Sequence, residues 1–316
     1  MVHDGRTGSA GLLAVHAHPD DETLSNGALL ATWAAAGGPV TVVTCTRGEQ
    51  GEVIPADLRH LEGDGPALAA HREGELAAAL RALGVRDHVF LDQVPHPGSG
   101  TARFADSGMA WAAAGRATAA DDVPADAFVR VSLDDAAGRL TDVIRSRRPD
   151  VVVGYEPGGG YGHPDHVRAH EVLHRAVELA AGAEADRWEV PVVLWTVVEE
   201  EPWGAALAEL RTRHGGGSAG LTVVDATARP SAVVVGPVDL RVPVAPVLDR
   251  VLAALGAHVT QVQGVGREPG EGAAVARLAL SDAVLQPVLA HESYVLARGR
   301  ADGVAWPAGV HPVGRR

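Results

Sequence analysis

The stretch from Gly11 to Gly27, GLLAVHAHPDDETLSNG, is an apolar run that turns abruptly into charge. Leu12 to His16 has the length and composition of a buried strand, and Leu24 to Ala36 has helical spacing. The polar residues between them include His18, Asp20, Asp21 and Glu22. A strand and a helix joined by such a segment predict one unit of an α/β sheet with a binding site at the strand's end.

The same alternation of strand and helix continues to about residue 200. Further apolar strands are predicted at Val40–Thr46, His88–Leu91, Val151–Gly154 and Val192–Val198, and helices at Pro66–Leu83, Leu133–Arg147 and Asp165–Ala180. Strands that are apolar throughout and separated by helices indicate a mostly parallel sheet covered on both faces, the Rossmann-like, doubly wound α/β class. In such a sheet we expect the first and fourth strands to be neighbours, so that the loops after them face each other.

The last third of the chain is less regular. We expect residues 1–190 to form the Rossmann-like catalytic domain, and residues 191–316 to add the remaining sheet strands and a smaller α+β elaboration, all in one structural unit. In this part we predict that Pro202–Gly220 is a helix running into the Gly-rich loop HGGGSAG, that Leu221–Val224, Ala232–Val235 and Val259–Gly264 are strands, and that Val247–Leu255 is a helix. In an earlier stretch, we predict a surface loop at Met109–Ala127.

Composition narrows the possible partners. Of the 316 residues, 46% are hydrophobic and 21% charged, as in ordinary globular proteins. The net charge of −13 argues against nucleic acid and anionic membranes, so we expect a small-molecule partner. All 27 basic residues are arginine, which excludes a P-loop or Schiff-base lysine, and the single cysteine, Cys45, excludes an internal disulfide. The N-terminus lacks a signal-peptide pattern and no run approaches ~20 apolar residues, so a cytoplasmic location is the expectation.

A second polar motif follows the predicted strand at Val151–Gly154. The sequence GGGYGHPDHVRAH places His163, Asp165 and His166 beyond that strand's end. Histidine and carboxylate groups are typical zinc ligands, and a catalytic zinc ion takes three protein ligands and keeps one position open for water. Because the two loops are expected to face each other, together they could supply these ligands. The sequence therefore predicts a metal site between the loops.

HPDDE followed by HPDH resembles the PIG-L/LmbE-like zinc-dependent N-deacetylases. Four further stretches resemble the actinobacterial branch of that family in mycothiol biosynthesis: TRGEQGEVI at Thr46–Ile54, HREGELAAALRALG at His71–Gly84, FADSGM at Phe104–Met109, and EPGGGYGHPDH. That branch removes acetate from N-acetylglucosaminyl-inositol and leaves a free amine. The resemblance is dense from Leu12 to Leu179 and thin beyond, apart from HESYVLARG near the C-terminus.

The resemblance implies roles for individual residues. The family's zinc ligands fall on His18, Asp21 and His166, and its general base falls on Asp20. Zn²⁺ is the implied cofactor, with Fe²⁺ as the alternative in the cell, because a His/Asp/His set with open positions suits either ion. A carboxylate beside the metal can accept the proton of the attacking water, and Asp20 adjoins Asp21.

The other implied roles concern the oxyanion of the reaction and the sugar. His163 would stabilise the oxyanion as an imidazolium, oriented by Asp165, since an adjacent carboxylate raises a histidine's pKa. The branch's substrate contacts fall on Arg72, Asp106 and Tyr161. Arg72 and Asp106 suit a polyhydroxylated sugar because they offer a donor fork and an acceptor to hydroxyl groups.

Each motif also has a plainer structural interpretation. Asp20 or Asp21 could be the N-cap of the following helix, and Glu22 could either stabilise its first turn or support the site from behind. Arg72 could pair with Glu75 on its own helix instead of binding substrate. The two motifs occurring in order favour the metal site over capping.

Two more histidines follow His166 at intervals of four residues, His170 and His174. This spacing places all three on one face of a helix, so a metal pair from His166 and His170 is geometrically possible. A helical turn of 5.4 Å carries His170 away from the loops, however. We therefore expect His170 to be a packed residue or one that supports the ligands from behind.

Three functions compete with that of the resembled branch. A sister branch, the mycothiol S-conjugate amidases, typically carries a lysine shortly after HPDDE, where this chain has Thr23 to Gly27 without one. The chain could also be a deacetylase of another N-acetyl amino sugar. A non-catalytic sugar-binding protein would have lost the base or a metal ligand, and neither is lost here.

Overall fold

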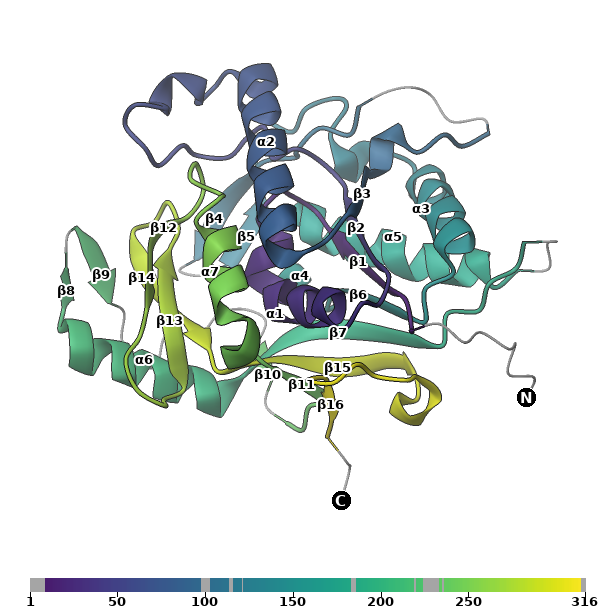
Figure 1. Cartoon of the computed structure of the whole chain (residues 1–316). Helices are drawn as coiled ribbons and strands as arrows, with labels where there is room; N and C mark the ends of the chain where they lie inside the picture. The colour runs from purple at the N-terminus through teal and green to yellow at the C-terminus, as the bar shows by residue number, and fades with distance from the viewer. Residues whose placement is uncertain are drawn as a thin grey trace.

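The computed structural model of the chain describes residues 9–97, 103–113, 116–120, 122–182, 186–218, 220–223, 233–234 and 236–313. Its largest element is a sheet of nine strands (Figure 1). In spatial order these are β16 (His311–Pro312), β11 (Leu240–Pro243), β15 (His291–Gly299), β7 (Val192–Glu199), β6 (Val151–Tyr155), β1 (Leu12–His16), β2 (Val40–Thr44) and β3 (Asp87–Phe90), with β10 (Val233–Val234) also paired to β7. Strands β7, β6, β1, β2 and β3 run parallel, while β15, β11 and β16 extend the sheet by antiparallel pairing.

Helices cover both faces of this sheet (Figure 1). One face carries α1 (Asp21–Ala35), α2 (Gly65–Leu83) and α7 (Leu248–Leu255), and the other carries α3 (Leu133–Arg147) and α5 (Pro164–Ala180). Successive strand side chains alternate between the faces: Leu12 and Ala14 pack with the first set of helices, and Leu13 and Val15 with the second. This explains why the central strands are largely apolar, and it confirms the predicted doubly wound α/β class.

The predicted neighbours at the centre of the sheet are confirmed. Leu12 in β1 pairs with Val40 in β2 on one side and with Val151 in β6 on the other. Because all three strands are parallel, the loops after β1 and β6 leave the sheet at the same edge.

A second sheet of five strands lies beside the first. Its order is β12 (Gln263–Arg267), β13 (Ala274–Ala279), β14 (Val284–Leu289), β9 (Leu221–Val223) and β8 (Gly217–Ser218), and α6 (Glu200–His214) packs on it. Ala206 and Leu210 of α6 share a small core cluster with Ala274. Residues 191–316 thus supply this sheet, helix α7, and the strands β7, β10, β11, β15 and β16 of the large one.

Helix α1 is interrupted and capped a second time inside its span. Asn26 has non-helical angles, φ −138° and ψ 15°, and its side-chain amide donates to the Thr196 hydroxyl at 2.7 Å. Just beyond this break, the Glu292 carboxylate from β15 accepts the N–H groups of Ala28 at 2.6 Å and Leu29 at 2.9 Å. Strand β15 therefore satisfies the donors that the break exposes.

Two predicted elements are wrong. Met109–Ala127 is not only loop, because β4 (Met109–Ala113) and β5 (Arg116–Ala119) pair as an antiparallel hairpin; an Ala/Gly-rich sequence carries no strand signal. The strand predicted at Val259–Gly264 is mostly a turn, and β12 begins only at Gln263. The main-chain N–H and hydroxyl of Thr260 bond Glu75 on α2, so their hydrogen bonds go to a helix side chain instead of a sheet.

Other boundaries shift by a few residues. The helix predicted from Pro202 begins at Glu200 and ends at His214, before the glycine-rich loop. Of the strands predicted at 221–224 and 232–235, residues 224, 232 and 235 lie outside the described part of the chain. Short helical segments complete the set: η1 (Arg59–Leu61), η2 (Leu91–Gln93), η3 (Phe128–Arg130), α4 (Gly159–Gly162), η4 (Ala245–Val247) and η5 (Ala301–Gly303). Among the described helices, none has both the length and the apolar content needed to cross a bilayer.

Candidate metal centre and active site

Both sequence motifs lie at the carboxyl edge of the large sheet. His18 and the first residue of α1, Asp21, follow β1, and His166 lies in the first turn of α5, which follows β6. All three side chains are buried. The neighbouring strands therefore bring together residues almost 150 positions apart in the sequence.

Three ligand atoms form a nearly equilateral triangle. His18 Nδ1 and Asp21 Oδ2 are 3.3 Å apart, His166 Nε2 and Asp21 Oδ2 are 3.3 Å apart, and the two nitrogens are 3.3 Å apart. Ligand atoms about 2.0–2.1 Å from one zinc ion in tetrahedral geometry lie about 3.3–3.4 Å from each other. The triangle therefore has the size that a zinc ion requires.

The far side of each imidazole is also arranged for metal binding. His18 Nε2 lies 3.3 Å from Asp165 Oδ2, and His166 Nδ1 lies 3.1 Å from the Gly159 carbonyl oxygen. A proton on each of these outer nitrogens satisfies both acceptors and leaves the inner nitrogens with free lone pairs. Metal-binding histidines typically donate to a carboxylate or carbonyl in this way. The donor set thus fits a divalent cation.

The charge around the site points to the same conclusion. Burial lowers the pKa of His18, but Asp106, Asp165 and Asp21 outweigh it and hold that pKa well above its usual value. Burial raises the pKa of Asp21, yet His166 and His18 hold it well below the ordinary value. Buried carboxylates gathered around one imidazole are an excess of negative charge that a cation would balance.

Two other sets of three side chains that include His18 could also hold a metal ion. His18, His163 and His166 offer atoms within 4.8 Å of one another, and so do His18, Asp106 and Asp165. The second group uses the histidine nitrogen that faces Asp165, whereas all three separations in the triangle with Asp21 are 3.3 Å. The set of His18, Asp21 and His166 is therefore the better candidate to hold a cation.

Asp20 lies next to this triangle in an unusual backbone conformation. It has φ 121° and ψ −36°, and although it precedes α1 its side chain makes no capping hydrogen bond. Its Oδ2 instead lies 3.0 Å from Arg72 Nη2. Burial raises the pKa of Asp20 to about 6 although Arg72 opposes the rise. A carboxylate with this pKa can both accept and release a proton near neutral pH.

Glu22 supports the site from behind. Its Oε2 accepts the Asp20 N–H at 2.9 Å, and its Oε1 lies 2.8 Å from Nε2 of His258, which follows α7. Burial raises the pKa of Glu22, but the contact with His258 outweighs burial and lowers it to about 2. Glu22 therefore does both things that the sequence allowed: it accepts the N–H of Asp20 at the start of α1, and it supports Asp20 from behind through its contact with His258.

His163 differs from the imidazolium that the sequence suggested. It is the N-cap of α5, and its Nδ1 accepts the main-chain N–H of Asp165 at 3.1 Å. Burial together with His18 and His166 lowers the pKa of His163 to about 2. His163 is therefore neutral, with its proton on Nε2, and it can act only as a hydrogen-bond donor from that atom.

Asp165 contacts His163 through its main chain, while its carboxylate serves other residues. Oδ2 lies 3.3 Å from His18 Nε2 and accepts the Ser107 N–H at 2.9 Å, and Oδ1 accepts the Ser107 hydroxyl. The Asp165 side chain is fully buried. The sequence analysis did not predict this role for Ser107, which belongs to the motif FADSGM. The signal that could have indicated it was a hydroxyl residue directly after Asp106.

The predicted substrate residues differ in exposure. Arg72 is only 2% exposed, and its guanidinium donates to the carbonyl groups of Gly48 and Pro19 as well as to Asp20, so it orients the loops of the site. Asp106 lies with Oδ1 3.7 Å from His18 Nε2. A direct contact of Arg72 with substrate stays a prediction.

Tyr161 lies beside the imidazoles of His163 and His166. It is half-buried, and its ring meets those of His166 and His163 edge-on at centroid distances of 5.0 and 5.9 Å. The Glu156 carboxylate shapes the glycine loop before it by accepting the N–H groups of Gly158 and Gly160. This placement fits the substrate role that the sequence implied, which stays a prediction.

Tyr155 is a further residue of the site that the sequence analysis missed. At the end of β6 its ring stacks on His166 at 4.3 Å, and its hydroxyl accepts the Ala17 N–H at 2.9 Å. His170 is packed as expected, with Nδ1 2.9 Å from the Tyr155 carbonyl oxygen. An aromatic residue closing an otherwise aliphatic strand was the only sequence signal.

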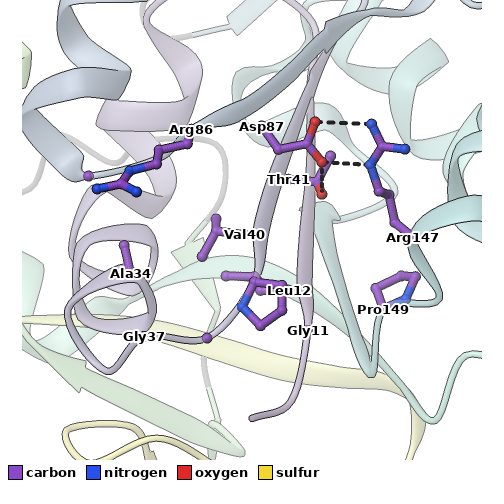
Figure 2. Close-up of a pocket in the computed structure, with 13 residues that line it drawn as sticks. Gly11, Leu12, Ala34, Gly37, Val40, Thr41, Arg86, Asp87, Arg147 and Pro149 are labelled. Atoms are coloured by element: carbon purple, nitrogen blue, oxygen red, sulfur yellow. Dashed lines mark hydrogen bonds and ion pairs between the residues drawn. The ribbon is translucent and has the colours of Figure 1, made fainter. Parts of the chain in front are cut away.

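A cavity of about 430 Å³ lies at the opposite edge of the sheet (Figure 2). It is lined by the residues where β1, β2 and β3 begin and where α1, α2 and α3 end. Arg147 in it donates to both oxygens of Asp87, at 2.6 and 3.1 Å. Arginines at helix C-termini balance the negative ends of helix dipoles. The cavity lies away from the polar motifs, and we assign it no part in the chemistry.

Residues 13–177 match the model of the PIG-L family, described as GlcNAc-PI de-N-acetylase. The chain belongs to this family. A relative from Kineococcus radiotolerans, named 1D-myo-inositol 2-acetamido-2-deoxy-alpha-D-glucopyranoside deacetylase, is 45% identical over 300 residues, which cover 92% of this chain and 78% of the relative. A relative of the same name from Streptomyces griseus is 42% identical over 293 residues, covering 91% and 83%.

Among solved structures, a conserved protein from Thermus thermophilus is similar with a TM-score of 0.47 and 22% identity, and the match covers 80% of each chain.

Both polar motifs, from His18 to His166, lie within the segment that matches the PIG-L family. His258 and Glu292, which contact α1, lie outside it. The site of this PIG-L chain thus includes contacts from residues beyond the matched segment.

Proposed function

We propose that this chain hydrolyses the acetamide of 1D-myo-inositol 2-acetamido-2-deoxy-alpha-D-glucopyranoside to the free amine and acetate, the reaction that the family resemblance associates with mycothiol biosynthesis. The observation that carries the proposal is the 3.3 Å triangle of His18, Asp21 and His166 with the Asp20 carboxylate beside it. Two relatives with this activity in their names, at 45% and 42% identity over most of the chain, support the substrate.

The metal is the first element of the proposal. His18, Asp21 and His166 would hold it, and Zn²⁺ fits their spacing, with Fe²⁺ as the alternative in the cell. When bound, such an ion lowers the pKa of a coordinated water and polarises the amide carbonyl. Asp165 and the Gly159 carbonyl keep the two imidazoles in the tautomers that binding requires.

Asp20 is the general base. Its carboxylate accepts a proton from the water that attacks the carbonyl carbon, and it returns the proton to the nitrogen when the C–N bond breaks. Arg72 holds one carboxylate oxygen, which leaves the other to face the water. The pKa of about 6 suits both halves of this cycle.

His163 stabilises the oxyanion as a neutral donor. Because Asp165 N–H occupies its Nδ1, the proton on Nε2 is directed away from the α5 N-terminus. A donor fixed before the reaction stabilises developing negative charge without having to reorganise. This function does not require the imidazolium form.

The sugar and inositol hydroxyls are assigned to Asp106 and Tyr161. Asp106 is fixed in position by the N–H groups of Gln50 at 3.2 Å and Gly108 at 2.9 Å. A carboxylate held by the main chain is a preorganised acceptor for hydroxyl groups. Tyr161 would pack against the pyranose ring beside the imidazoles.

The test is to incubate zinc-loaded protein with the proposed substrate and to follow release of a primary amine. We expect turnover by the wild-type protein, and a rate about 10²–10⁴-fold lower for Asp20→Asn at unchanged zinc content. Normal turnover by Asp20→Asn would show that the base is another residue.

Failure of the zinc-loaded wild-type protein to release amine would refute the substrate. A mycothiol conjugate and other N-acetyl amino sugars would then be assayed in the same way. Binding of such sugars without hydrolysis of any would favour the non-catalytic alternative.

A further inference from the structure

A buried contact links the C-terminal part of the chain to the backbone of the general base. His258 lies in the turn between α7 and β12, and its Nε2 is 2.8 Å from Glu22 Oε1. Both side chains are fully buried. The other oxygen of Glu22 accepts the N–H of Asp20 at 2.9 Å. One carboxylate therefore joins His258 to the peptide group that carries the base.

The backbone of Asp20 needs such support. Its φ of 121° with ψ −36° lies outside the regions that residues with a side chain adopt readily. A conformation of this kind persists only where the surroundings hold it. Arg72 fixes the carboxylate of Asp20, and Glu22 fixes its N–H. Loss of either contact would let the peptide rotate and carry the carboxylate away from the metal ligands.

The turn that carries His258 is itself anchored. The main-chain N–H of Thr260 donates to Glu75 Oε1 at 2.8 Å, and its hydroxyl donates to Glu75 Oε2 at 2.7 Å. Glu75 lies on α2 three residues after Arg72, so one helix supports both sides of the base. These contacts, together with the chain from His258 to Thr260 and the helix turn from Arg72 to Glu75, close a ring around Asp20 and Glu22.

His258 is poorly satisfied if stability is its sole purpose. Its Nδ1 is buried and has no hydrogen-bond partner among the described residues. A buried nitrogen without a partner costs stability, so this histidine does not satisfy all of its own hydrogen-bonding groups. The side-chain hydrogen bond that the structure gives His258 is the one to Glu22, which leads to the base.

We propose that His258 is a positioning residue for Asp20 and acts through Glu22. The proposal rests on the proposed function, because it takes Asp20 as the general base. It gives His258, a residue beyond the family match, a part in the reaction through its hydrogen bond to Glu22.

The experiment is a double-mutant cycle in the full-length, zinc-loaded protein. The proteins are wild type, His258→Leu, Asp20→Asn and the double variant, assayed for kcat and KM with N-acetylglucosaminyl-inositol. We expect His258→Leu to lower kcat about 10–100-fold, as small misplacements of catalytic groups do, with KM and zinc content unchanged. In the Asp20→Asn background the same change should lower the residual rate less than about twofold, because the group it positions is already absent.

The chain offers a matched control. His214 Nε2 lies 2.8 Å from Glu268 Oε1, so this pair is a second histidine–glutamate contact, away from the site, in which Glu268 is also held by Arg213 and Arg277. We expect His214→Leu to leave kcat and KM unchanged. His258→Gln, which keeps an N–H donor, should restore kcat to within about threefold of wild type.

Equal losses of kcat in both backgrounds would overturn the proposal, since they would indicate a purely structural role, and so would an unchanged kcat. Normal turnover by Asp20→Asn would refute the proposed function instead, so the two failures are distinguishable. If circular dichroism shows that His258→Leu does not fold, Glu22→Gln replaces it in the cycle. Its kcat loss should again vanish in the Asp20→Asn background, and a loss of equal size there would overturn the proposal.

Discussion

Replacing Asp165 by Asn should weaken zinc binding. Asp165 Oδ2 lies 3.3 Å from the outer nitrogen of His18, and two donors from Ser107 hold the carboxylate in place. A carboxylate that accepts from a metal-binding histidine fixes its ring and increases its basicity, and removal of such a partner typically costs about 10–100-fold in metal affinity. That range corresponds to about 1.4–2.7 kcal/mol of binding free energy.

The neighbouring substitution should have a smaller effect. Ser107→Ala removes the hydroxyl donor to Oδ1 but keeps the main-chain donor to Oδ2. One hydrogen bond to a charged group contributes about 1.5–3 kcal/mol to a folded structure, and only the part that reorients Asp165 reaches the metal. We therefore expect a loss of zinc affinity below that of Asp165→Asn.

The assay is competition for Zn²⁺ against a chelator of known affinity, with purified apoprotein. Asp142→Asn is the matched control, because Asp142 pairs with the partly exposed His96 at 2.6 Å away from the site. If Asp165→Asn binds zinc as tightly as wild type but loses kcat, the carboxylate acts on the reaction instead, and our account of its contact with His18 is refuted.

Three further predictions follow from local geometry. Gly159→Ala should lower zinc affinity more than about tenfold in the same assay, because a Cβ at this position would lie 2.9 Å from His166 Cβ and displace that ligand. Gly160→Ala is the control: Gly160 also has positive φ, but no atom lies near its added Cβ, so this variant should bind zinc normally. Burial lowers the pKa of His88 to about 4, below its ordinary value of 6.5. Between pH 6.5 and 4 the His88 side chain is therefore protonated in the unfolded chain but not in the folded protein, so the free energy of unfolding should fall by up to about 3 kcal/mol as the pH drops through this window. Urea unfolding of His88→Gln should show a flatter pH dependence, and an identical slope would contradict this. Arg72→Lys should lower kcat at least about tenfold without loss of zinc, because an ammonium cannot span the oxygens that the guanidinium fork contacts; unchanged kcat would refute its role in orienting the base.

Much of the fold was predictable from local patterns. The apolar strands of the parallel sheet and the helices between them were predicted close to their observed bounds; Leu133–Arg147 matches α3 at both ends. Strands buried on both faces leave a continuous apolar signal, and helix ends carry glycine or charge. The antiparallel strands gave no such signal, because half-buried strands such as β13 alternate in burial.

The sequence by itself determined the chemistry available at the site. Histidine and carboxylate residues at two strand ends indicated a divalent cation, and their order along the chain indicated the family. Local sequence also carried the strand order at the centre of the sheet, because parallel strands joined by helices have few ways to connect.

Only the tertiary structure decided what each of these groups does. His163 is neutral because burial, together with the neighbouring imidazoles, lowers its pKa, and a main-chain N–H occupies its other nitrogen. Asp165 turns its carboxylate to His18, and Arg72 is buried against the Asp20 carboxylate. The contact between Glu22 and His258 joins residues 236 positions apart. Protonation, orientation and burial depend on which groups surround a side chain in space, and a linear pattern does not record neighbours that come from distant parts of the chain.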